Sequence, residues 1–525
     1  MQMLSALDAT FIYLESEHSP MAIGAVYVID AKDAPKDFAY QKWRALVESR
    51  LRYSKVFRER LIQVPWDLSF PYWIRDPDFD LDAHLPCLTL PEPGGMKELM
   101  QAAAKEFGQI LDRGRPLWEI SFVEGLDTIP GISKGSFALV TKVHHAAVDG
   151  KASSEMMTAL LDLTAEMRPL DDDDTWEPEE MPSNAKVIAR SWLNIGHKAV
   201  DLAGFAGKVA VGAAGMRGDA RLKKLQPPPR ILSAPATRFN QPLSAGRTFW
   251  GKNFDFSRFK TIRKAVPGTT INDVVLAICS GGLRSYLAGS DELPEKPLVA
   301  MAPISVRGGE KGNEQGAGNK VSAMLVNLAT DIDEPLARLR FIHSNTQRSK
   351  VQASALPVDK ITEFLPSETL AAAARLYTRT RLGGIHRPFF NVTITNVPGP
   401  PVPLYVAGAR VHSAFGMAPI MDGLGLILVV LSYDGRISIG ISSCEEICPD
   451  PQHLALCFEQ SLQELEKAAK QADSKGQDAV QKPLQSVEGS KIKMASDSLK
   501  AFHDANEALE QAIKSLKESE IGKKG

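Results

Sequence analysis

Cysteine, net charge and long apolar runs are all scarce in this sequence. The 525 residues contain five cysteines, an odd number at scattered positions, which argues for a reducing compartment and against a disulfide framework: Cys87, Cys279, Cys444, Cys448 and Cys457. Cys444 and Cys448 lie close together, but no second pair accompanies them to complete a zinc site, so we expect no metal. The formal net charge of −2 gives no support to a nucleic-acid partner.

Targeting and nucleotide-binding signals are also missing. No apolar run approaches the ~20 residues that span a bilayer, and the N-terminus has no basic region followed by an apolar core. We therefore expect a cytoplasmic protein. No G-x-G-x-x-G opens a helix and no Walker motif occurs, which leaves nucleotide-dependent redox or ATP chemistry without support.

One serine motif matches a pattern found in hydrolases. Residues 131–135, GISKG, fit the nucleophile pattern G-x-S-x-G of lipases and esterases. That elbow requires a strand before the serine and a helix after it. Here Pro130 precedes the motif and a strand follows it, so we predict a hairpin turn.

The chain is long enough for more than one core, because single cores rarely grow past about 250–300 residues. An acidic stretch at 169–182, PLDDDDTWEPEEMP, indicates a domain edge. We predict four regions, which are an N-terminal domain at 1–170, an acidic then helical linker at 171–236, a second domain at 237–473 and a polar linker with an amphipathic helical tail at 474–525.

The linker and the tail each leave alternatives open. Residues 184–217 look helical and small-sided, and they either pack closely against other helices or rest a basic end on anionic lipid. The tail spaces apolar residues along one helical face between 497 and 519. It covers the body of the protein, pairs with a partner helix or lies on a lipid surface.

Strand and helix patterns alternate along both predicted domains. This alternation favours an α/β or α+β fold. Strands are expected at 22–30, from 118, at 137–144, 247–256, 297–306, 321–329, 390–397, 424–433 and 436–443, and helices at 36–51, 96–111, 334–348, 360–382 and 452–470.

The stretch from Phe137 to Leu163 organises the chain. An apolar run suited to a buried strand ends at His144 and His145, a short turn reaches Asp149-Gly150, and a helical pattern begins at Ala152. Adjacent residues on a strand point to opposite sides, so one histidine is expected to face a reaction site and the other to pack or hydrogen-bond. Asp149 either bonds backbone N–H groups of the turn or pairs with a distant arginine.

Spacing along the chain also predicts positions for Asn272 and Trp118. Thr270 is expected to cap a helix, which places Asn272 in its first turn, near the positive end of the helix dipole. The Asn272 amide either donates to a developing oxyanion or only caps the helix or holds a neighbouring loop. Trp118 opens a strand and is expected to be a buried core tryptophan.

Several of these motifs resemble one family. HHAAVDG (144–150) resembles the HHxxxDG signature of the CoA-dependent acyltransferase superfamily, which includes chloramphenicol acetyltransferases and condensation domains. LSALDATFIYLE, RPLWE, IND and NVPGP add a resemblance to the bacterial wax ester synthase/diacylglycerol acyltransferase family over about residues 4–470. The resemblance implies two chloramphenicol-acetyltransferase-like domains with mixed sheets flanked by helices and an active-site tunnel at their interface. It assigns NVPGP to shaping that tunnel.

The resemblance also implies a chemistry. His145 is the expected general base, His144 orients or packs, Asp149 anchors the turn, and donors near Asn272 stabilise the oxyanion. The expected reaction moves a long-chain acyl group from acyl-CoA, a co-substrate and not a bound cofactor, to a fatty alcohol or diacylglycerol. Lipophilic substrates imply peripheral contact with a membrane or lipid-droplet surface. The alternatives are a carrier-protein-dependent, condensation-like acyltransferase and a non-catalytic lipid-binding protein of the same fold.

Overall fold

The computed structural model describes residues 1–34, 40–148, 156, 159–168, 176–191, 229, 233–305, 321–355, 367–384 and 386–481. Residues 1–469 form one compact unit and residues 470–525 a second. The predicted helix from Ala152 lies outside the described residues except for Met156, Ala159 and Leu160. The small-sided stretch beyond residue 191 and the tail beyond residue 481 also lie outside them.

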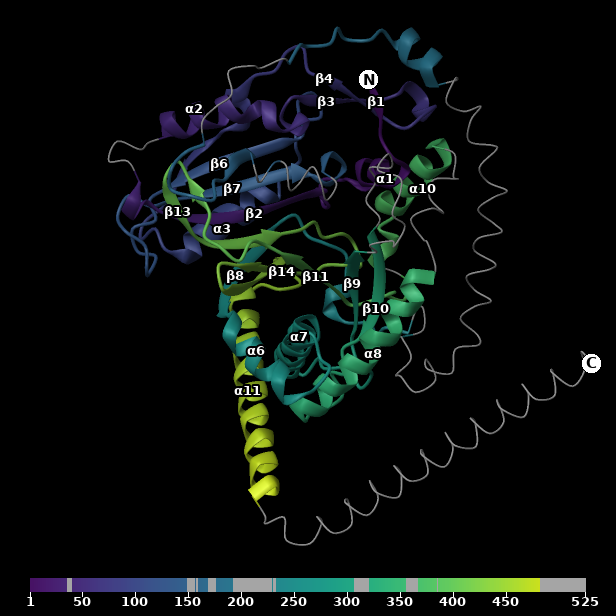
Figure 1. The fold of residues 1–525 in the computed structure, drawn as a ribbon. Helices are drawn as coiled ribbons and strands as arrows, with labels where there is room; N and C mark the ends of the chain where they lie inside the picture. Colours follow the sequence, from purple (N-terminus) through teal and green to yellow (C-terminus); the bar gives the residue numbers. More distant parts are fainter. Residues whose placement is uncertain are drawn as a thin grey trace, which may run out of the picture. The chain divides into compact units, whose positions relative to one another are not determined.

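A mixed six-stranded sheet carries the central histidine motif (Figure 1). Its order is β12-β13-β2-β7-β6-β5, and its neighbours are antiparallel except for the parallel pair β5 and β6. Every residue of β7 is buried, including the polar Thr141, Lys142 and His144, in agreement with the predicted buried strand. The strands are β2 (Ala22–Asp30), β5 (Cys87–Thr89), β6 (Trp118–Glu124), β7 (Phe137–His144), β12 (Tyr405–Val406) and β13 (Ala409–Met417).

A second six-stranded sheet is built from the C-terminal half of the chain. Its order is β10-β9-β11-β14-β15-β8, with β11 parallel to both β9 and β14 and the other pairs antiparallel. The strands are β8 (Arg247–Asp255), β9 (Val299–Ser305), β10 (Val321–Asn327), β11 (Val392–Pro398), β14 (Ile427–Tyr433) and β15 (Arg436–Cys444).

Helices flank both sheets, and a small third sheet, β1-β4-β3, lies near the N-terminus. These elements are β1 (Gln2–Met3), β3 (Glu59–Ile62), β4 (Tyr72–Arg75), α1 (Ala6–Leu14), α2 (Tyr40–Arg50), α3 (Met96–Phe107), α6 (Phe256–Ala265), α7 (Ile271–Ala288), α8 (Pro335–Ala355), α10 (Ser367–Arg379) and α11 (Pro451–Gln481), with a further helical stretch at 184–191. Among the described residues, no helix has both the length and the apolarity needed to cross a membrane.

Strand β13 joins the two halves of the chain. It pairs with β2 in the first sheet, yet it also contacts β8, β14 and β15 of the second sheet. Glycines permit this approach, because a Cβ at Gly440 would lie 2.0 Å from the carbonyl oxygen of Gly416. A segment within the predicted C-terminal domain thus completes the N-terminal sheet. The boundaries at 170 and 237 remain a prediction.

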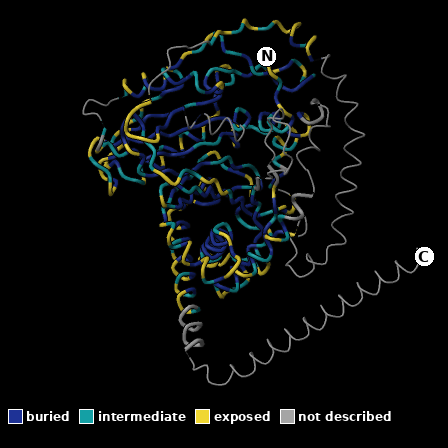
Figure 2. Tube along the Cα trace, viewed as in Figure 1, coloured by how far each residue is buried: buried dark blue, intermediate teal, exposed yellow. Residues whose placement is uncertain are grey.

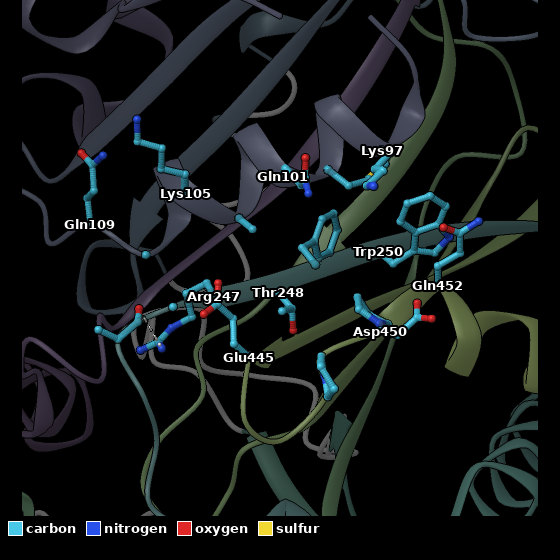
Figure 3. A pocket seen from close by; sticks show the side chains of 18 residues that line it. Lys97, Gln101, Lys105, Gln109, Arg247, Thr248, Trp250, Glu445, Asp450 and Gln452 are labelled. Carbon is cyan, nitrogen blue, oxygen red and sulfur yellow. Dashed lines mark hydrogen bonds between the residues drawn. The ribbon is translucent and has the colours of Figure 1, made fainter. Parts of the chain in front are cut away.

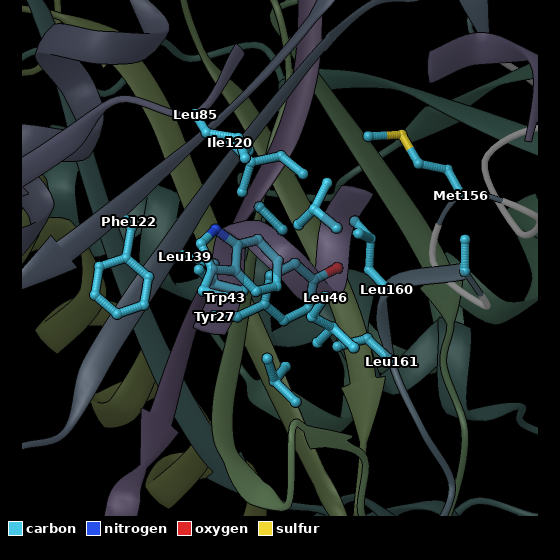
Figure 4. Close-up of a cluster of buried hydrophobic side chains, with 14 of the residues drawn as sticks. Tyr27, Trp43, Leu46, Leu85, Ile120, Phe122, Leu139, Met156, Leu160 and Leu161 are labelled. Carbon is cyan, nitrogen blue, oxygen red and sulfur yellow. The ribbon is translucent and has the colours of Figure 1, made fainter. Parts of the chain in front are cut away.

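One large cluster of buried apolar side chains lies on one face of the first sheet (Figure 4), and burial is concentrated along the strands (Figure 2). Trp43 of α2 and Leu139 of β7 are in this cluster, and fully burying one such side chain contributes about 1.5–3 kcal/mol. Trp118 also belongs to it, and its Nε1–H donates to the carbonyl oxygen of Phe57 at 3.0 Å. The prediction of a buried core tryptophan is therefore confirmed.

Helix α7 begins as its sequence predicts. The Thr270 hydroxyl accepts a hydrogen bond from the backbone N–H of Asp273, and the Asp273 carboxylate accepts one from the backbone N–H of Thr270. Beyond this start, most of the helix is buried. A Cβ at Gly282 would lie 2.1 Å from the ring of Phe458 in α11, so the glycine lets the two helices pack closely.

The predicted mixed α/β fold with two sheets is confirmed, and most predicted strands and helices occur with ends shifted by a few residues. The predicted strands do not include β13. Its sequence ARVHSAFGM lacks strict alternation, and a register shift between Val411 and Ser413 interrupts its pairing.

Candidate active site

The histidine pair lies where β7 ends. His144 is the last residue of β7, and His145 opens a 3-10 helix that ends at Ala147. The His144 N–H donates to the carbonyl oxygen of Leu117 (2.9 Å), and the His145 N–H donates to that of Met21 (2.8 Å). The RPLWE segment and the residue before β2 thus fix the backbone of both histidines.

His144 belongs to a buried charged network. Its side chain is fully buried, its Nδ1 accepts the backbone N–H of Ala146 (3.0 Å), and its Nε2 lies 3.4 Å from Oε1 of Glu15. Because Nδ1 is an acceptor, the ring proton of neutral His144 must be on Nε2, toward the carboxylate. The structure therefore gives His144 a hydrogen-bonded, inward-facing position.

Glu15 also hydrogen-bonds Met21, just before β2, and Arg113, just before the RPLWE segment. Its Oε1 accepts the backbone N–H of Met21 (3.1 Å), and its Oε2 accepts two hydrogen bonds from Arg113, at 2.8 and 3.2 Å. Burial alone raises the pKa of Glu15, but its contacts with His144 and Arg113 outweigh burial and lower this pKa to about 2. Glu15 is therefore charged at neutral pH.

His145 has a different environment. Its ring stacks on that of Phe11 in α1, with centroids 3.9 Å apart and planes 16° apart. Its Nδ1 is buried and has no hydrogen-bond partner among the described residues, while the residue as a whole is only partly buried. Burial and, to a lesser degree, the neighbouring His144 lower the pKa of His145 to about 4, although its own backbone carbonyl opposes this shift. The imidazole is therefore neutral at pH 7.

Asn272 is positioned on α7 by a partner that sequence reasoning missed. Its Oδ1 accepts a hydrogen bond from Nδ2 of Asn396 at 3.2 Å. Thr270 and Asp273 cap the helix, so the alternative in which Asn272 is the cap is wrong. Its contact with β11 agrees with the alternative in which it holds a neighbouring segment, and it leaves the amide Nδ2 able to donate elsewhere.

Asp273, the next residue, is structural in this arrangement. It is buried and accepts hydrogen bonds from the hydroxyl of Thr346 (2.7 Å) and from Nδ1 of His343 (2.9 Å). Burial raises the pKa of Asp273, but these contacts and those from Thr270 lower it below the ordinary value. Within the IND segment, Asp273 is thus buried in the capping interaction of α7, whereas Asn272 is partly exposed.

The predicted site residues fall into two groups. His144 and His145 contact α1, while Asn272 contacts β11, and among the described residues neither histidine hydrogen-bonds Asn272. Asp149 lies outside the described residues. Glu15 is in the LSALDATFIYLE segment and Asn396 is in NVPGP, but no spacing in the sequence connects either to its partner.

A cavity of about 780 Å³ lies between α3 and β8 (Figure 3). Lys97, Gln101 and Lys105 of α3 face it from one side, and Arg247 and Trp250 of β8 from another. None of the predicted site residues lines it. A smaller cavity shares four of its lining residues and extends to Pro20, which precedes the Met21 that binds His145. The two cavities therefore adjoin each other, and among the described residues neither is lined by His144 or His145.

The GISKG motif is a turn, as predicted. It lies between the antiparallel strands β6 and β7, and the hydroxyl and N–H of Ser133 both donate to the carboxylate of Asp30. A 3-10 helix follows β7, and no helix follows Ser133 directly. This geometry does not form a nucleophile elbow.

Sequence comparisons cover nearly the whole chain. The profile described as the wax ester synthase/diacylglycerol acyltransferase catalytic domain matches residues 4–275, and that of the WS/DGAT C-terminal domain matches residues 317–466. O-acyltransferase WSD of Acinetobacter baylyi is 31% identical over 506 residues, which cover 90% of this chain and 99% of that protein.

A solved structure agrees with these matches. The wax ester synthase/diacylglycerol acyltransferase from Marinobacter aquaeolei aligns with a TM-score of 0.64 at 29% identity, covering 90% of this chain and 100% of that one. The catalytic-domain match contains the histidine pair and Asn272. The chain belongs to the wax ester synthase/diacylglycerol acyltransferase family.

Proposed function

We propose that this chain is an acyl-CoA-dependent O-acyltransferase. It moves a long-chain acyl group onto a fatty alcohol, giving a wax ester, or onto diacylglycerol, giving triacylglycerol. Beside the family membership, the observation that carries the proposal is His145, a neutral and partly accessible imidazole held rigidly at the end of β7. Acyl-CoA is a co-substrate here.

His145 is the general base of the proposed reaction. Its Nε2 removes the hydroxyl proton as the alcohol oxygen attacks the thioester carbonyl, and the proton then passes to the CoA thiolate as the carbon–sulfur bond breaks. The stack on Phe11 holds the ring plane. His144 and Glu15 act as positioning residues that fix the backbone turn, and Asp149 is assigned to anchoring that turn.

Asn272 is the proposed oxyanion donor. The tetrahedral intermediate carries a negative charge on the former carbonyl oxygen, and a fixed amide N–H stabilises it without reorganisation. Asn396 fixes the Asn272 amide by donating to its Oδ1, so Nδ2 is the atom that donates to the oxyanion. The positive end of α7 favours the same charge.

The substrates suggest where the protein acts. Fatty alcohols and diacylglycerol partition into lipid, so we propose that the protein works in the cytoplasm at a membrane or lipid-droplet surface. The cavity between α3 and β8, with its extension toward Pro20, is the proposed entry for one of the two substrates. Its apolar wall includes Met100 and Phe249.

A thiol-release assay tests the proposed reaction. Purified protein is given palmitoyl-CoA with hexadecanol, with a diacylglycerol or with no acceptor, and the free CoA thiol is measured together with the ester product. We expect release that depends on acceptor and forms an equal amount of ester. Ser133→Ala is the matched control and should keep the rate within about twofold, because Ser133 only closes a surface turn.

Each other outcome contradicts a stated part of the proposal. Release without acceptor indicates a thioesterase. Loss of acceptor-dependent release in Ser133→Ala would favour a serine mechanism. A protein that is inert with acyl-CoA but active with an acyl-carrier thioester would be the condensation-like enzyme, and one that binds lipid without turnover would be the non-catalytic form.

The pH dependence of the reaction follows from His145. Because burial lowers the pKa of His145 from 6.5 to about 4, the base stays deprotonated through neutral and mildly acidic pH. We expect kcat/KM to be level down to about pH 5 and to fall with an apparent pKa near 4. An acid limb near the ordinary value of 6.5 would contradict the buried environment of the ring.

Stability must be followed in the same experiment. His145 binds protons more weakly in the folded than in the unfolded chain. Between about pH 4 and 6.5, its titration therefore makes the free energy of unfolding of the protein rise with pH. Glu15 contributes stability above pH 4.5 that is lost as the pH falls toward 2. Chemical unfolding at each pH therefore separates loss of the base from loss of the fold.

A further inference from the structure

Three large apolar side chains are exposed around α10. Trp66 is 79% exposed, Leu376 59% and Phe389 47%. We call Trp66, Leu376 and Phe389, with Arg379 and Arg387, the α10 face. All five residues are exposed. Trp66 comes from the turn at 65–67, Leu376 and Arg379 from α10, and Arg387 and Phe389 from the segment that follows α10.

Trp66 is held outward by an unusual backbone. Trp66 and Asp67 both have positive φ, 55° and 54°, a conformation that bulky residues rarely adopt. Arg375 of α10 fixes this turn, because its guanidinium pairs with both carboxylate oxygens of Asp67, at 2.5 and 3.1 Å. An exposed tryptophan at a strained position points to a function for that side chain.

The segment that carries Arg387 and Phe389 also contacts α10. The Tyr377 hydroxyl lies 3.1 Å from Nε2 of His386, whose ring is 5.4 Å from that of Phe389. The opposite side of α10 is occupied, since Ala371 and Ala374 are buried against α1. The apolar side chains of the α10 face are thus anchored around the outward side of α10.

Arginine is frequent around and after α10, although α10 itself also contains Glu368. Residues 369–421 contain five arginines and no aspartate or glutamate, in a chain whose net charge is −2. Three of these arginines pair with acids from elsewhere, namely Arg375 with Asp67, Arg381 with Asp422 and Arg410 with Asp434. No described carboxylate pairs with Arg379 or Arg387, so the α10 face carries positive charge beside its apolar side chains.

The α10 face also lies close to the proposed base. Helix α10 packs on α1, as Figure 1 shows, and α1 carries the Phe11 that stacks on His145. One helix therefore separates this face from the catalytic imidazole. A lipid surface in contact with α10 would place its dissolved alcohols or glycerides next to the site.

We propose that the α10 face docks on the surface of an anionic phospholipid membrane. Trp66, Leu376 and Phe389 enter the interfacial layer, where tryptophan is favoured, and Arg379 and Arg387 meet lipid phosphates. The inference rests on the proposed function, because lipid-dissolved acceptors give the docking its purpose.

Vesicle co-sedimentation of the full chain tests the proposal. We compare vesicles of phosphatidylcholine alone with vesicles that also contain phosphatidylglycerol, at low and high salt. Wild type should bind the anionic vesicles more tightly, and salt should weaken that binding. Trp66→Ser with Leu376→Ser should weaken it about tenfold, and Arg379→Glu with Arg387→Glu about fivefold or more per arginine.

The matched control is Leu456→Ser. Leu456 is a 49% exposed leucine on α11, away from the α10 face, and its replacement should leave vesicle binding unchanged. Equal binding of the α10-face variants and wild type overturns the proposal. A change in oligomeric state of these variants, without a change in vesicle binding, also overturns it and indicates a protein partner.

Turnover of short, water-soluble acyl-CoA and alcohol separates this proposal from the proposed function. The α10-face variants should keep wild-type rates with those substrates and lose rate only with vesicle-borne hexadecanol. Vesicle binding without any turnover contradicts the proposed function alone. Turnover without binding through this face contradicts the docking proposal alone.

Discussion

Replacement of His145 by alanine is expected to lower kcat/KM for acceptor-dependent thiol release by about 10²–10⁴-fold, the usual contribution of a general base. No second neutral base is in reach in the proposed arrangement, because His144 is fully buried with its ring proton toward Glu15. The measurement is steady-state kinetics with palmitoyl-CoA and hexadecanol, with circular dichroism and thermal unfolding as tests of the fold.

A second buried histidine supplies the control. His84 is also buried, stacks on Trp118 and contacts its carbonyl oxygen through Nδ1 (2.7 Å). His84→Ala should lower stability, as core truncations do, and keep kcat/KM within a few-fold. Added imidazole should restore part of the rate of His145→Ala, because the deletion leaves space beside Phe11. Full activity of His145→Ala would refute the assignment of the base.

The parts of the fold that sequence predicted are those dictated by local pattern. Strand β7 begins with the apolar run Phe137–Val140, and the Thr270 cap with Asp273 three residues later marks the start of α7. Strand β13 was missed because its apolar pattern is irregular and its pairing shifts at Val411. Its role depends on contacts with both sheets, which no local pattern encodes.

The same distinction applies to the site. The motif resemblance predicts His145, His144 and Asn272 as site residues, while their partners Glu15 and Asn396 lie far from them in sequence. A buried carboxylate paired with Arg113 and His144 looks in the sequence like any glutamate at the end of a helix. Likewise, Asn396 sits in a segment that we interpreted only as a tunnel-shaping turn. Its contact with Asn272 makes it a residue that orients the proposed oxyanion donor.

Replacement of Asn272 by alanine is expected to reduce kcat/KM by about 10²–10³-fold, as loss of one oxyanion donor does elsewhere. Asn396→Ala should cost less, because it removes only the group that orients the donor. Once Asn272 is absent, removing Asn396 should have little further effect, so the double variant should be close to Asn272→Ala alone. Steady-state kinetics of the four proteins measure this coupling.

Thr270→Ala separates chemistry from helix stability. Thr270 caps α7 two residues before Asn272, and losing such a cap costs about 1 kcal/mol of stability. If Asn272 acted only by supporting the helix start, Thr270→Ala and Asn272→Ala would lower kcat/KM and stability in parallel. Under the oxyanion assignment, Thr270→Ala lowers the free energy of unfolding and leaves kcat/KM within a few-fold, whereas Asn272→Ala does the reverse. For the Asn272→Ala, Asn396→Ala double variant, a loss of kcat/KM equal to the product of the two single losses would show that Asn396 acts independently of Asn272.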